Sequence, residues 1–381
     1  MSGEQQLLWL RCETKPFEHR SALTPITARK LIDAGFKLVV ERDPQRFFAD
    51  EEFDKVGCEL AENNSWPKAP PNAIIIGLKE LPPNDDSPLI HTHVMFGHCY
   101  KQQAGYQEIL NRFKRGGGTL LDMEFLQDEH TKRRVAAFGF HAGFNGSAVG
   151  LLALGSMVSG EGSLGELKPF KDEDELIARG KKEFNQVVSK LGRHPRALVI
   201  GALGRCGSGA VNFFKKIGMD KAEPKANSML REDIVEWDMA ETAKGGPFQE
   251  ILEADIFINC IYLTSKIPSF ITHETITAAG SSRQLRVVVD VSCDTTNPNN
   301  PIPIYDVNTT FDAPTVPVKL DGGVPSLEVC SIDHLPTLLP REASEQFSND
   351  LLPTLLQLKT MDRSKVWTEA RDLFHKMANS I

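Results

Sequence analysis

Short apolar runs alternate with segments of helical periodicity along the first third of the chain. The apolar runs predict β-strands at residues 7–10, 37–41, 73–76, 93–96 and 119–121, and the helical spacing predicts α-helices at 26–34 and 102–114. Thr24-Pro25 is typical of a helix start, because proline is favoured at the first helical position. Strands that are separated by helices pair in parallel, so the pattern predicts a doubly wound α/β sheet.

A glycine-rich turn follows a later apolar run, residues 197–200, and opens a further α/β segment. The turn reads Gly201-Ala-Leu-Gly204-Arg-Cys-Gly207-Ser-Gly209 and leads into a helical pattern. Small residues there let the backbone approach a pyrophosphate, and the helix N-terminus offers unpaired N–H groups. The spacing is G-x-x-G-x-x-G and departs from the usual G-x-G-x-x-G, so the motif alone is a weak indication of dinucleotide binding. Its position in the middle of the chain, after a predicted strand, is the stronger indication. More strands are predicted at 234–237, 255–259 and 286–291.

Length and pattern together predict two Rossmann-like doubly wound α/β domains with a cleft between them. A chain of 381 residues is too long for one ordinary core. The glycine turn assigns dinucleotide binding to residues 138–339, which leaves residues 1–137 for the substrate. Helical patterns at 340–358 and 364–379 are expected to return to the first domain, so about 340–381 are assigned to it.

Composition and charge argue against several classes of partner. The net charge of −8 disfavours nucleic acid, which needs a basic surface. We find no apolar run that approaches the roughly 20 residues needed to span a bilayer, and no basic leader before an apolar stretch. The last residues, 378–381, do not form a peroxisomal signal, so a cytoplasmic location is expected.

The seven cysteines are scattered and form no C-x-x-C pair, which disfavours a structural zinc site. Their odd number fits a reducing compartment. Cys206 and Cys260 both follow predicted strands of one sheet, so a bridge between them is conceivable, but free thiols are the preferred interpretation.

Polar residues gather where the strands of the first domain end, which is where ligands bind in open parallel sheets. In chain order these residues are Arg11, Glu13, Arg20, Lys79, Glu80, His98, Asp122, Glu124, Arg133 and Arg134. Arginine is the usual partner of substrate carboxylates, and the pKa values of lysine and histidine shift most readily toward neutrality. Any single arginine could instead be an ordinary surface cation, and His98 could be structural. The occurrence of Lys79 and His98 at adjacent strand ends favours a functional role for both.

Two further motifs admit alternatives. His91-Thr-His93, with His98 nearby, could hold zinc, but no matching ligands occur on later strands. Asp238 closes a strand after the glycine turn, where a carboxylate accepts hydrogen bonds from ribose hydroxyls and repels a 2′-phosphate. This favours NAD over NADP, and a helix cap is the less favoured role for Asp238.

Several segments together closely resemble one family, the fungal NAD-dependent, L-lysine-forming saccharopine dehydrogenases of the alanine dehydrogenase and transhydrogenase superfamily. The segments that carry the resemblance span nearly the whole chain and are Arg11–Pro25, Ile76–Glu80, Phe96–Gly105, Arg133–Phe140, Ile200–Gly209, Asp290–Pro298 and Ser331–Pro336. The resemblance implies oxidation of L-saccharopine by NAD⁺, with water, to L-lysine, 2-oxoglutarate and NADH.

The resemblance also implies roles for individual residues. Lys79 matches the base that deprotonates the secondary amine, and His98 matches the acid–base group of imine hydrolysis. The positions that match substrate contacts are Arg20, Lys79, Gln103, Arg134, Phe138, Ser292, Cys293 and Asp294. The positions that match contacts with NAD are Arg133, Gly204, Arg205, Asp238, Thr242, Tyr262, Val291, Ile332, Asp333, His334 and Leu335. We add the hypothesis that Glu80 and Glu124 tune the local pKa values, and no metal is expected.

Two other functions share some of these features. An alanine dehydrogenase-like enzyme has the same opening motif but needs one carboxylate clamp, whereas this chain carries several arginines and a Phe-Gly-His-Cys-Tyr string. A non-catalytic NAD-binding module would make Lys79 and His98 dispensable. In either enzyme the partners are small molecules, and the chain is expected to be a monomer without nucleic-acid or membrane partners.

Overall fold

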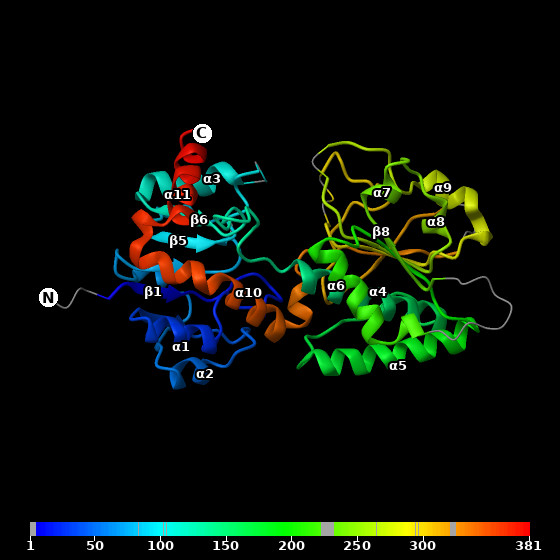
Figure 1. Ribbon diagram of the computed structural model, residues 1–381, viewed down its shortest axis with the longest axis horizontal. Helices are drawn as coiled ribbons and strands as arrows, with labels where there is room; N and C mark the ends of the chain where they lie inside the picture. The colour runs from blue at the N-terminus through cyan, green and yellow to red at the C-terminus, as the bar shows by residue number, and fades with distance from the viewer. Residues whose placement is uncertain are drawn as a thin grey trace. The chain divides into compact units, whose positions relative to one another are not determined.

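The strands form two separate sheets, one in each of two units of the chain (Figure 1). The first unit comprises Met1–Phe138 and Pro340–Ile381, and the second comprises Gly139–Leu339. The computed structural model describes residues 5–82, 84–101, 103, 105–221, 232–263, 265–293, 295, 297–320 and 325–381. The unit bounds lie close to the predicted domain bounds, and the assignment of substrate and dinucleotide to these units stays a prediction.

The sheet of the first unit has six strands in the order β3-β2-β1-β4-β5-β6, and all its pairs are parallel. Its strands are β1 (Leu7–Leu10), β2 (Lys37–Glu41), β3 (Glu59–Ala61), β4 (Ile74–Ile76), β5 (Thr92–Met95) and β6 (Thr119–Asp122). The chain winds outward from β1 to β3, then returns to β4 and winds outward in the other direction. The order therefore reverses between β1 and β4, and such switch points are where open α/β sheets bind ligands.

Helices follow the strands as the periodicity predicts. The helices of the first unit are α1 (Pro25–Asp33), α2 (Asp50–Lys55), α3 (Tyr106–Gly116), α10 (Pro340–Leu355) and α11 (Lys365–Ala378), with 3₁₀ turns η1 (Trp66–Lys68) and η5 (Leu356–Arg363). Thr24 caps α1 by accepting a hydrogen bond from the Thr27 backbone N–H. Helix α3 begins later than predicted because Gly105, at φ +80°, forms a left-handed cap in front of Tyr106.

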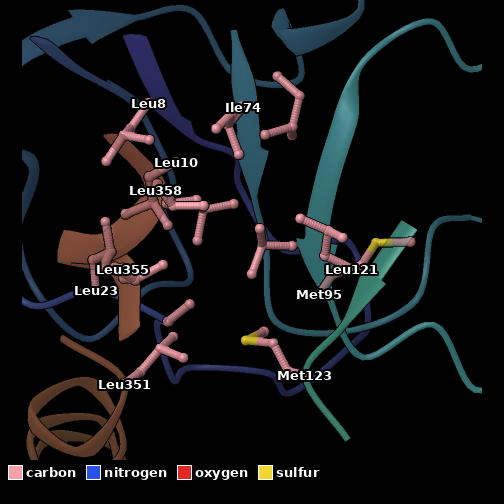
Figure 2. Packing of buried hydrophobic residues seen from close by; sticks show 14 of the residues in the cluster. Leu8, Leu10, Leu23, Ile74, Met95, Leu121, Met123, Leu351, Leu355 and Leu358 are labelled. Carbon is pink, nitrogen blue, oxygen red and sulfur yellow. The ribbon is translucent and has the colours of Figure 1, made fainter. Parts of the chain in front are cut away.

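The C-terminal segment packs on the core of the first unit. Figure 2 shows Leu358 beside Leu10 of β1, and Leu351 and Leu355 of α10 close to Leu23. All of these side chains are buried in one hydrophobic cluster, together with Trp367. Residues from the N-terminal and C-terminal parts of the chain thus form one hydrophobic core. Each buried leucine contributes about 2 kcal/mol of transfer free energy to folding.

The sheet of the second unit is also six-stranded, in the order β11-β12-β10-β9-β7-β8, and only its edge strand β11 is antiparallel. Its strands are β7 (Ala197–Ile200), β8 (Ile234–Trp237), β9 (Ile256–Asn259), β10 (Val287–Asp290), β11 (Val316–Pro317) and β12 (Glu328–Cys330). Its helices are α4 (Gly139–Ser159), α5 (Glu173–Leu191), α6 (Arg205–Lys216), α7 (Met239–Thr242), α8 (Gln249–Leu252) and α9 (His273–Ala279), with 3₁₀ turns η2 (Met219–Lys221), η3 (Gly280–Ser282) and η4 (Leu335–Leu338). The prediction of an α/β fold with two doubly wound sheets is confirmed.

Helix α4 corrects one expectation from the sequence. Its 21 residues are long and apolar enough to cross a membrane by length and composition, whereas the sequence pattern did not indicate an apolar run of this length. Most of the helix, 78% of its apolar window, is buried inside the second unit. A helix that is apolar on all sides is also typical of the core of a large globular domain, and the burial of α4 fits that role.

His93 lies in the hydrophobic core of the first unit. Its ring is fully buried and packs edge-on against Trp66, at 5.0 Å, and Phe113, at 5.4 Å. Neither ring nitrogen has a hydrogen-bond partner among the residues that the structure describes. His91 is buried too, with Nε2 3.0 Å from the carbonyl oxygen of Ala69, so both histidines of the motif lie in the core. Burial, with the charges of Arg11, His91 and Arg112, places the pKa of His93 well below 6.5.

We expect His93→Leu to remove part of the acid sensitivity of the fold. In the native state His93 stays neutral, whereas in the unfolded chain it gains a proton below about pH 6.5. Wild-type stability therefore falls as pH decreases below that value, by at most about 1.4 kcal/mol per pH unit from this group. Urea denaturation at pH 5, 6 and 7 should show a smaller loss toward pH 5 in the variant. Parallel pH dependences in the two proteins would contradict this account.

Candidate active site

Lys79 and His98 follow neighbouring strands of the first unit. Strand β4 ends three residues before Lys79 and pairs in parallel with β5, which ends shortly before His98. Parallel strands bring their carboxyl ends to one edge of the sheet, so the two residues emerge side by side there. The Lys79 side chain is largely buried, at 8% exposure, whereas His98 is partly accessible. His98 has a left-handed backbone, φ 49°, which is uncommon outside glycine.

Glu80 links the two candidate catalytic groups. Its Oε2 lies 3.1 Å from Nδ1 of His98, and its Oε1 lies 3.7 Å from Nζ of Lys15. Burial alone would raise the pKa of Glu80, but the hydrogen bond from His98 and the charges of Lys79 and Lys15 outweigh it. The pKa is therefore lowered, and Glu80 is a carboxylate at neutral pH.

Arg11 and Glu13 form a buried pair at the end of β1, and this pair holds the backbone beside Lys79. The Glu13 carboxylate accepts hydrogen bonds from the backbone N–H groups of Leu78, at 2.6 Å, and Lys79, at 2.9 Å. The Arg11 guanidinium lies 3.4 Å from the same carboxylate and donates to the carbonyl oxygen of Lys79. Burial raises the pKa of Glu13, and Arg11 opposes that rise. Arg11 is thus neither a surface cation nor an exposed clamp.

Arg20 is held by two neighbours in the first unit. Its Nε and Nη2 donate to the two oxygens of Glu18, at 2.7 and 2.6 Å. Its guanidinium carbon lies 4.2 Å from the centre of the Phe138 ring. The Nη1 edge has no hydrogen-bond partner among the residues that the structure describes, which fits the carboxylate contact expected of Arg20.

Glu124 has different partners from Glu80. Its Oε1 forms ion pairs with Lys101, at 2.7 Å, and Arg134, at 3.2 Å. Burial would raise the pKa of Glu124, but Lys101, Arg134 and His98 lower it overall. Gln103 accepts a hydrogen bond from the Lys101 backbone N–H, so it lies beside the same cation. Glu124 therefore tempers the charge of the surrounding cations more directly than that of Lys79.

Asp122, at the end of β6, is a buried carboxylate near this edge of the sheet. It accepts hydrogen bonds from the backbone N–H groups of Gly97 and Glu124. Burial raises its pKa to about 6.

Arg133, a predicted NAD contact, lies exposed in the loop of the first unit that precedes Arg134, whereas all the other predicted NAD contacts belong to the second unit.

The glycine turn of the second unit has the geometry of a dinucleotide cradle. Gly201 has φ +85°, a left-handed conformation that favours glycine. A Cβ at Gly207 would overlap the carbonyl oxygen of Gly201, so only glycine fits there. Gly204 is the N-cap of α6 and Arg205 is its first residue, so the free N–H groups of α6 open onto the turn.

A pocket of about 760 Å³ lies beside this turn within the second unit. Its lining includes Gly201, Gly204, Asp238, Thr242 and Tyr262. A volume of this size is in the range of small-molecule and cofactor sites. The residues present therefore fit a dinucleotide, and Gly204, Asp238, Thr242 and Tyr262, all predicted contacts, lie around one pocket.

Asp238 is the N-cap of α7, the role that the sequence had favoured less. Its two oxygens accept from the backbone N–H groups of Leu203, at 3.1 Å, and Met239, at 2.8 Å. Thr242 donates to the carbonyl oxygen of Asp238, which fixes this turn further. A carboxylate oxygen can accept more than one hydrogen bond, so the cap is compatible with a ribose contact.

A buried carboxylate, Asp290, shapes the loop at the end of β10. It accepts hydrogen bonds from Asn259, the Ser292 hydroxyl and Tyr305, at 2.9, 2.6 and 2.6 Å. Cys293 follows with φ 39°. Val291, Ser292 and Cys293 thus lie on one loop at a strand end of the second unit, whereas Asp294 lies outside the described residues.

The segment 332–335, also predicted to contact NAD, is fixed by side chains of the second unit. The Asn145 amide donates to the carbonyl oxygen of Leu335, at 2.9 Å, and Nδ1 of His334 lies 2.6 Å from Asp333. Ile332 and His334 are buried, and Asp333 is exposed. The sequence did not single out Asn145, because nothing in an apolar helix marks one amide as a loop anchor.

Cys206 and Cys260 lie within hydrogen-bonding reach of one another. This contact, together with burial, raises the pKa of Cys260. Both are free thiols, as the sequence favoured.

Two parallel α/β sheets, one with a glycine cradle and one with a lysine and a histidine at neighbouring strand ends, define a class of pyridine-nucleotide dehydrogenase folds. Residues 9–145 match the N-terminal domain of alanine dehydrogenase/PNT. The fold resembles that of a solved L-alanine dehydrogenase, with a TM-score of 0.64 at 16% identity over 97% of this chain and 94% of that one. A transhydrogenase from Sinorhizobium meliloti gives 0.61 at 14% identity, over 96% and 97% of the two chains.

The particular family follows from more similar relatives. The chain is 56% identical over 368 residues to the NAD(+), L-lysine-forming saccharopine dehydrogenase of Neurospora crassa, covering 97% of this chain and 95% of the relative. It is 52% identical over 388 residues to the protein of that name from Candida albicans, covering 99% and 98%. The chain belongs to the family of L-lysine-forming saccharopine dehydrogenases.

Proposed function

We propose that this protein is an NAD-dependent saccharopine dehydrogenase, which converts L-saccharopine, NAD⁺ and water to L-lysine, 2-oxoglutarate and NADH. The observation that carries the proposal is the placement of Lys79 and His98 at adjacent strand ends, with Glu80, the chain neighbour of Lys79, 3.1 Å from Nδ1 of His98. The family membership of the chain supports the same reaction. The reaction is the last step of the α-aminoadipate route to lysine.

The first chemical task is to make the secondary amine neutral, because a protonated nitrogen has no lone pair to assist hydride departure. Lys79, whose side chain is largely buried at this strand end, takes this proton as a general base. Bound NAD⁺ would supply the hydride acceptor for the glutamate-side carbon, and the pocket with Gly204, Asp238 and Tyr262 would hold it. The substrate nitrogen and this carbon then share an imine bond.

The second task is hydrolysis of that imine. His98 removes a proton from the attacking water and later returns it to the lysine nitrogen as the carbinolamine collapses. Glu80 holds Nδ1 of His98, which leaves Nε2 as the working nitrogen. The hydrogen bond therefore orients the imidazole.

Substrate binding is assigned to the cations of the first unit. Saccharopine carries three carboxylates, and the Nη1 edge of Arg20 is placed to receive one of them. Arg134 and Gln103 lie beside Glu124 and Lys101 and are proposed as further contacts. Phe138 supports Arg20 by its ring face. Ser292, Cys293 and Asp294 are proposed contacts from the second unit.

NAD is assigned to the pocket of the second unit. We assign the pyrophosphate to the turn around Gly204 and Arg205, and the adenosine ribose to Asp238. A carboxylate at this place repels a 2′-phosphate, which selects NAD over NADP. Tyr262, Thr242, Val291 and the segment 332–335 complete the proposed contacts, with Arg133 from the first unit. A monomeric state and a cytoplasmic location stay predictions.

One assay tests the proposed substrate. NADH should be consumed when both L-lysine and 2-oxoglutarate are present, and neither should suffice alone. Pyruvate with ammonia serves as the alanine dehydrogenase control and should give no consumption. Turnover with pyruvate and ammonia but not with lysine and 2-oxoglutarate would refute the proposal.

Lys79→Met and His98→Gln are expected to lower kcat by about 10²–10⁴, the usual range for loss of an acid–base group. Their NADH affinity, measured by fluorescence titration, should stay within about twofold of wild type, because the proposed cofactor pocket lies in the other unit. Full activity in either variant would support a non-catalytic role for that residue.

Glu80→Gln is expected to move the pH–rate profile toward lower pH by about half to one unit. The lowered pKa of Glu80 keeps this side chain a carboxylate, with Oε2 3.1 Å from Nδ1 of His98. In general, loss of a neighbouring negative charge favours the deprotonated form of a catalytic base, and the rate follows that form. Glu124→Gln is the matched comparison and should shift the profile less, since Lys101 and Arg134 are its ion-pair partners. Equal shifts in the two variants would contradict a specific role for Glu80.

A further inference from the structure

An aromatic ring of helix α10 stacks on Phe138, which contacts Arg20, the predicted substrate-binding arginine. The Phe347 ring of α10 is fully buried and lies parallel to the Phe138 ring, with centroids 4.2 Å apart and planes 6° apart. The Arg20 guanidinium lies 4.2 Å from the centre of the same Phe138 ring. Two groups this close cannot share one face, so Phe138 lies between Phe347 and Arg20.

The same face of α10 also fixes the backbone next to Arg20. The hydroxyl of Ser344 accepts a hydrogen bond from the Ser21 N–H, at 3.0 Å. One turn later, the Ser348 hydroxyl contacts that of Thr27 in α1. Positions 344, 347 and 348 share one side of the helix. Helix α10 therefore contacts the surroundings of Arg20 in two ways. Ser344 binds the backbone of the next residue, Ser21, and Phe347 packs on Phe138, which contacts the guanidinium.

Both neighbours of the Arg20 guanidinium restrict its position in different ways. The two hydrogen bonds to Glu18 restrict movement of the guanidinium within its own plane. The face of the Phe138 ring restricts its movement perpendicular to that plane. A planar guanidinium stacks well on an aromatic ring. Phe138 is itself only partly buried, and its ring contacts two aromatic rings: Phe347, stacked at 4.2 Å, and Phe96, tilted by 49° at 6.5 Å.

We propose that Phe347 is a positioning residue for substrate binding, which acts through Phe138 to hold Arg20 in the orientation that receives a substrate carboxylate. The inference rests on the proposed function, because it takes Arg20 as a carboxylate contact. Phe347 touches neither substrate nor cofactor in this account. Its contact with Phe96, the ring beside His98, is tilted by 44° at 5.8 Å, so its effect on His98 is smaller.

The test compares Phe347→Met with a matched control, Phe374→Met. Methionine conserves most of the volume but lacks a flat rigid face. Phe374 is similarly buried, on α11 of the same unit, and packs edge-on against Phe113. We expect Phe347→Met to raise the KM for saccharopine about tenfold. Its kcat should change by less than about threefold, and its KM for NAD⁺ should not change. The control should lose comparable thermal stability and keep the wild-type KM.

A double variant separates positioning from general loosening of the core. In an Arg20→Lys background, Phe347→Met should raise the KM by less than about twofold further, because the planar group that it positions is already gone. Multiplicative effects, a wild-type KM in Phe347→Met, or an equal rise in Phe374→Met would each overturn the inference. If Phe347→Met is unstable, the KM for saccharopine is measured in Phe347→Leu instead. Absence of saccharopine turnover in the wild-type protein would instead overturn the proposed function, and this inference with it.

Discussion

The buried contact between Glu13 and the backbone at Leu78 and Lys79 is the constraint on which the proposed chemistry depends. It joins the end of β1 to the segment after β4, across the point where the strand order of the first sheet reverses. A buried carboxylate is costly unless its hydrogen bonds are satisfied. Two backbone donors and Arg11 offset that cost, so the chain leaving β4 has one path. That path determines where Lys79 and Glu80 emerge.

From this fixed segment the remaining groups follow in sequence. Glu80 reaches His98 at the end of the next strand, and the parallel register of β4 and β5 keeps the two at one edge. Arg20 is held from a different direction, by Glu18 and by the ring of Phe138. The proposed base and the proposed carboxylate contact are thus held by separate contacts.

The periodicity of the sequence was sufficient for the sheets, because parallel strands buried on both faces are continuous apolar runs. It also placed Lys79 and His98 after neighbouring strands, as the structure has them, and their catalytic roles stay a proposal. The short strands β3, β11 and β12 were not predicted, since Glu-Leu-Ala, Val-Pro and Glu-Val-Cys are not apolar runs, whereas the three isoleucines of β4 are. The cap made by Asp238 was less favoured than a ribose contact, because the sequence does not show that the Leu203 and Met239 N–H groups lie within reach; the ribose contact stays a proposal.

The residues that the sequence missed act through contacts distant along the chain. Ser344 meets Ser21 across 323 positions, and Phe347 meets Phe138 from a helix that reads as an ordinary core helix. No local spacing signals such a contact. Glu18 could have been found, since it precedes Arg20 by two positions in a segment already singled out. Arg11 was expected at the ligand-binding edge, with a surface cation as the favoured interpretation for any single arginine. Only the fold reveals that it is buried with Glu13.

A crystal structure of the protein with NAD⁺ and saccharopine tests the central claim most directly, namely that the strand ends of the first sheet present Lys79 to the reacting nitrogen. The account predicts Nζ of Lys79 within about 3.2 Å of the secondary amine, or joined to it by one water. An amine nitrogen that faces another titratable side chain, with Lys79 turned away from the substrate, would contradict it.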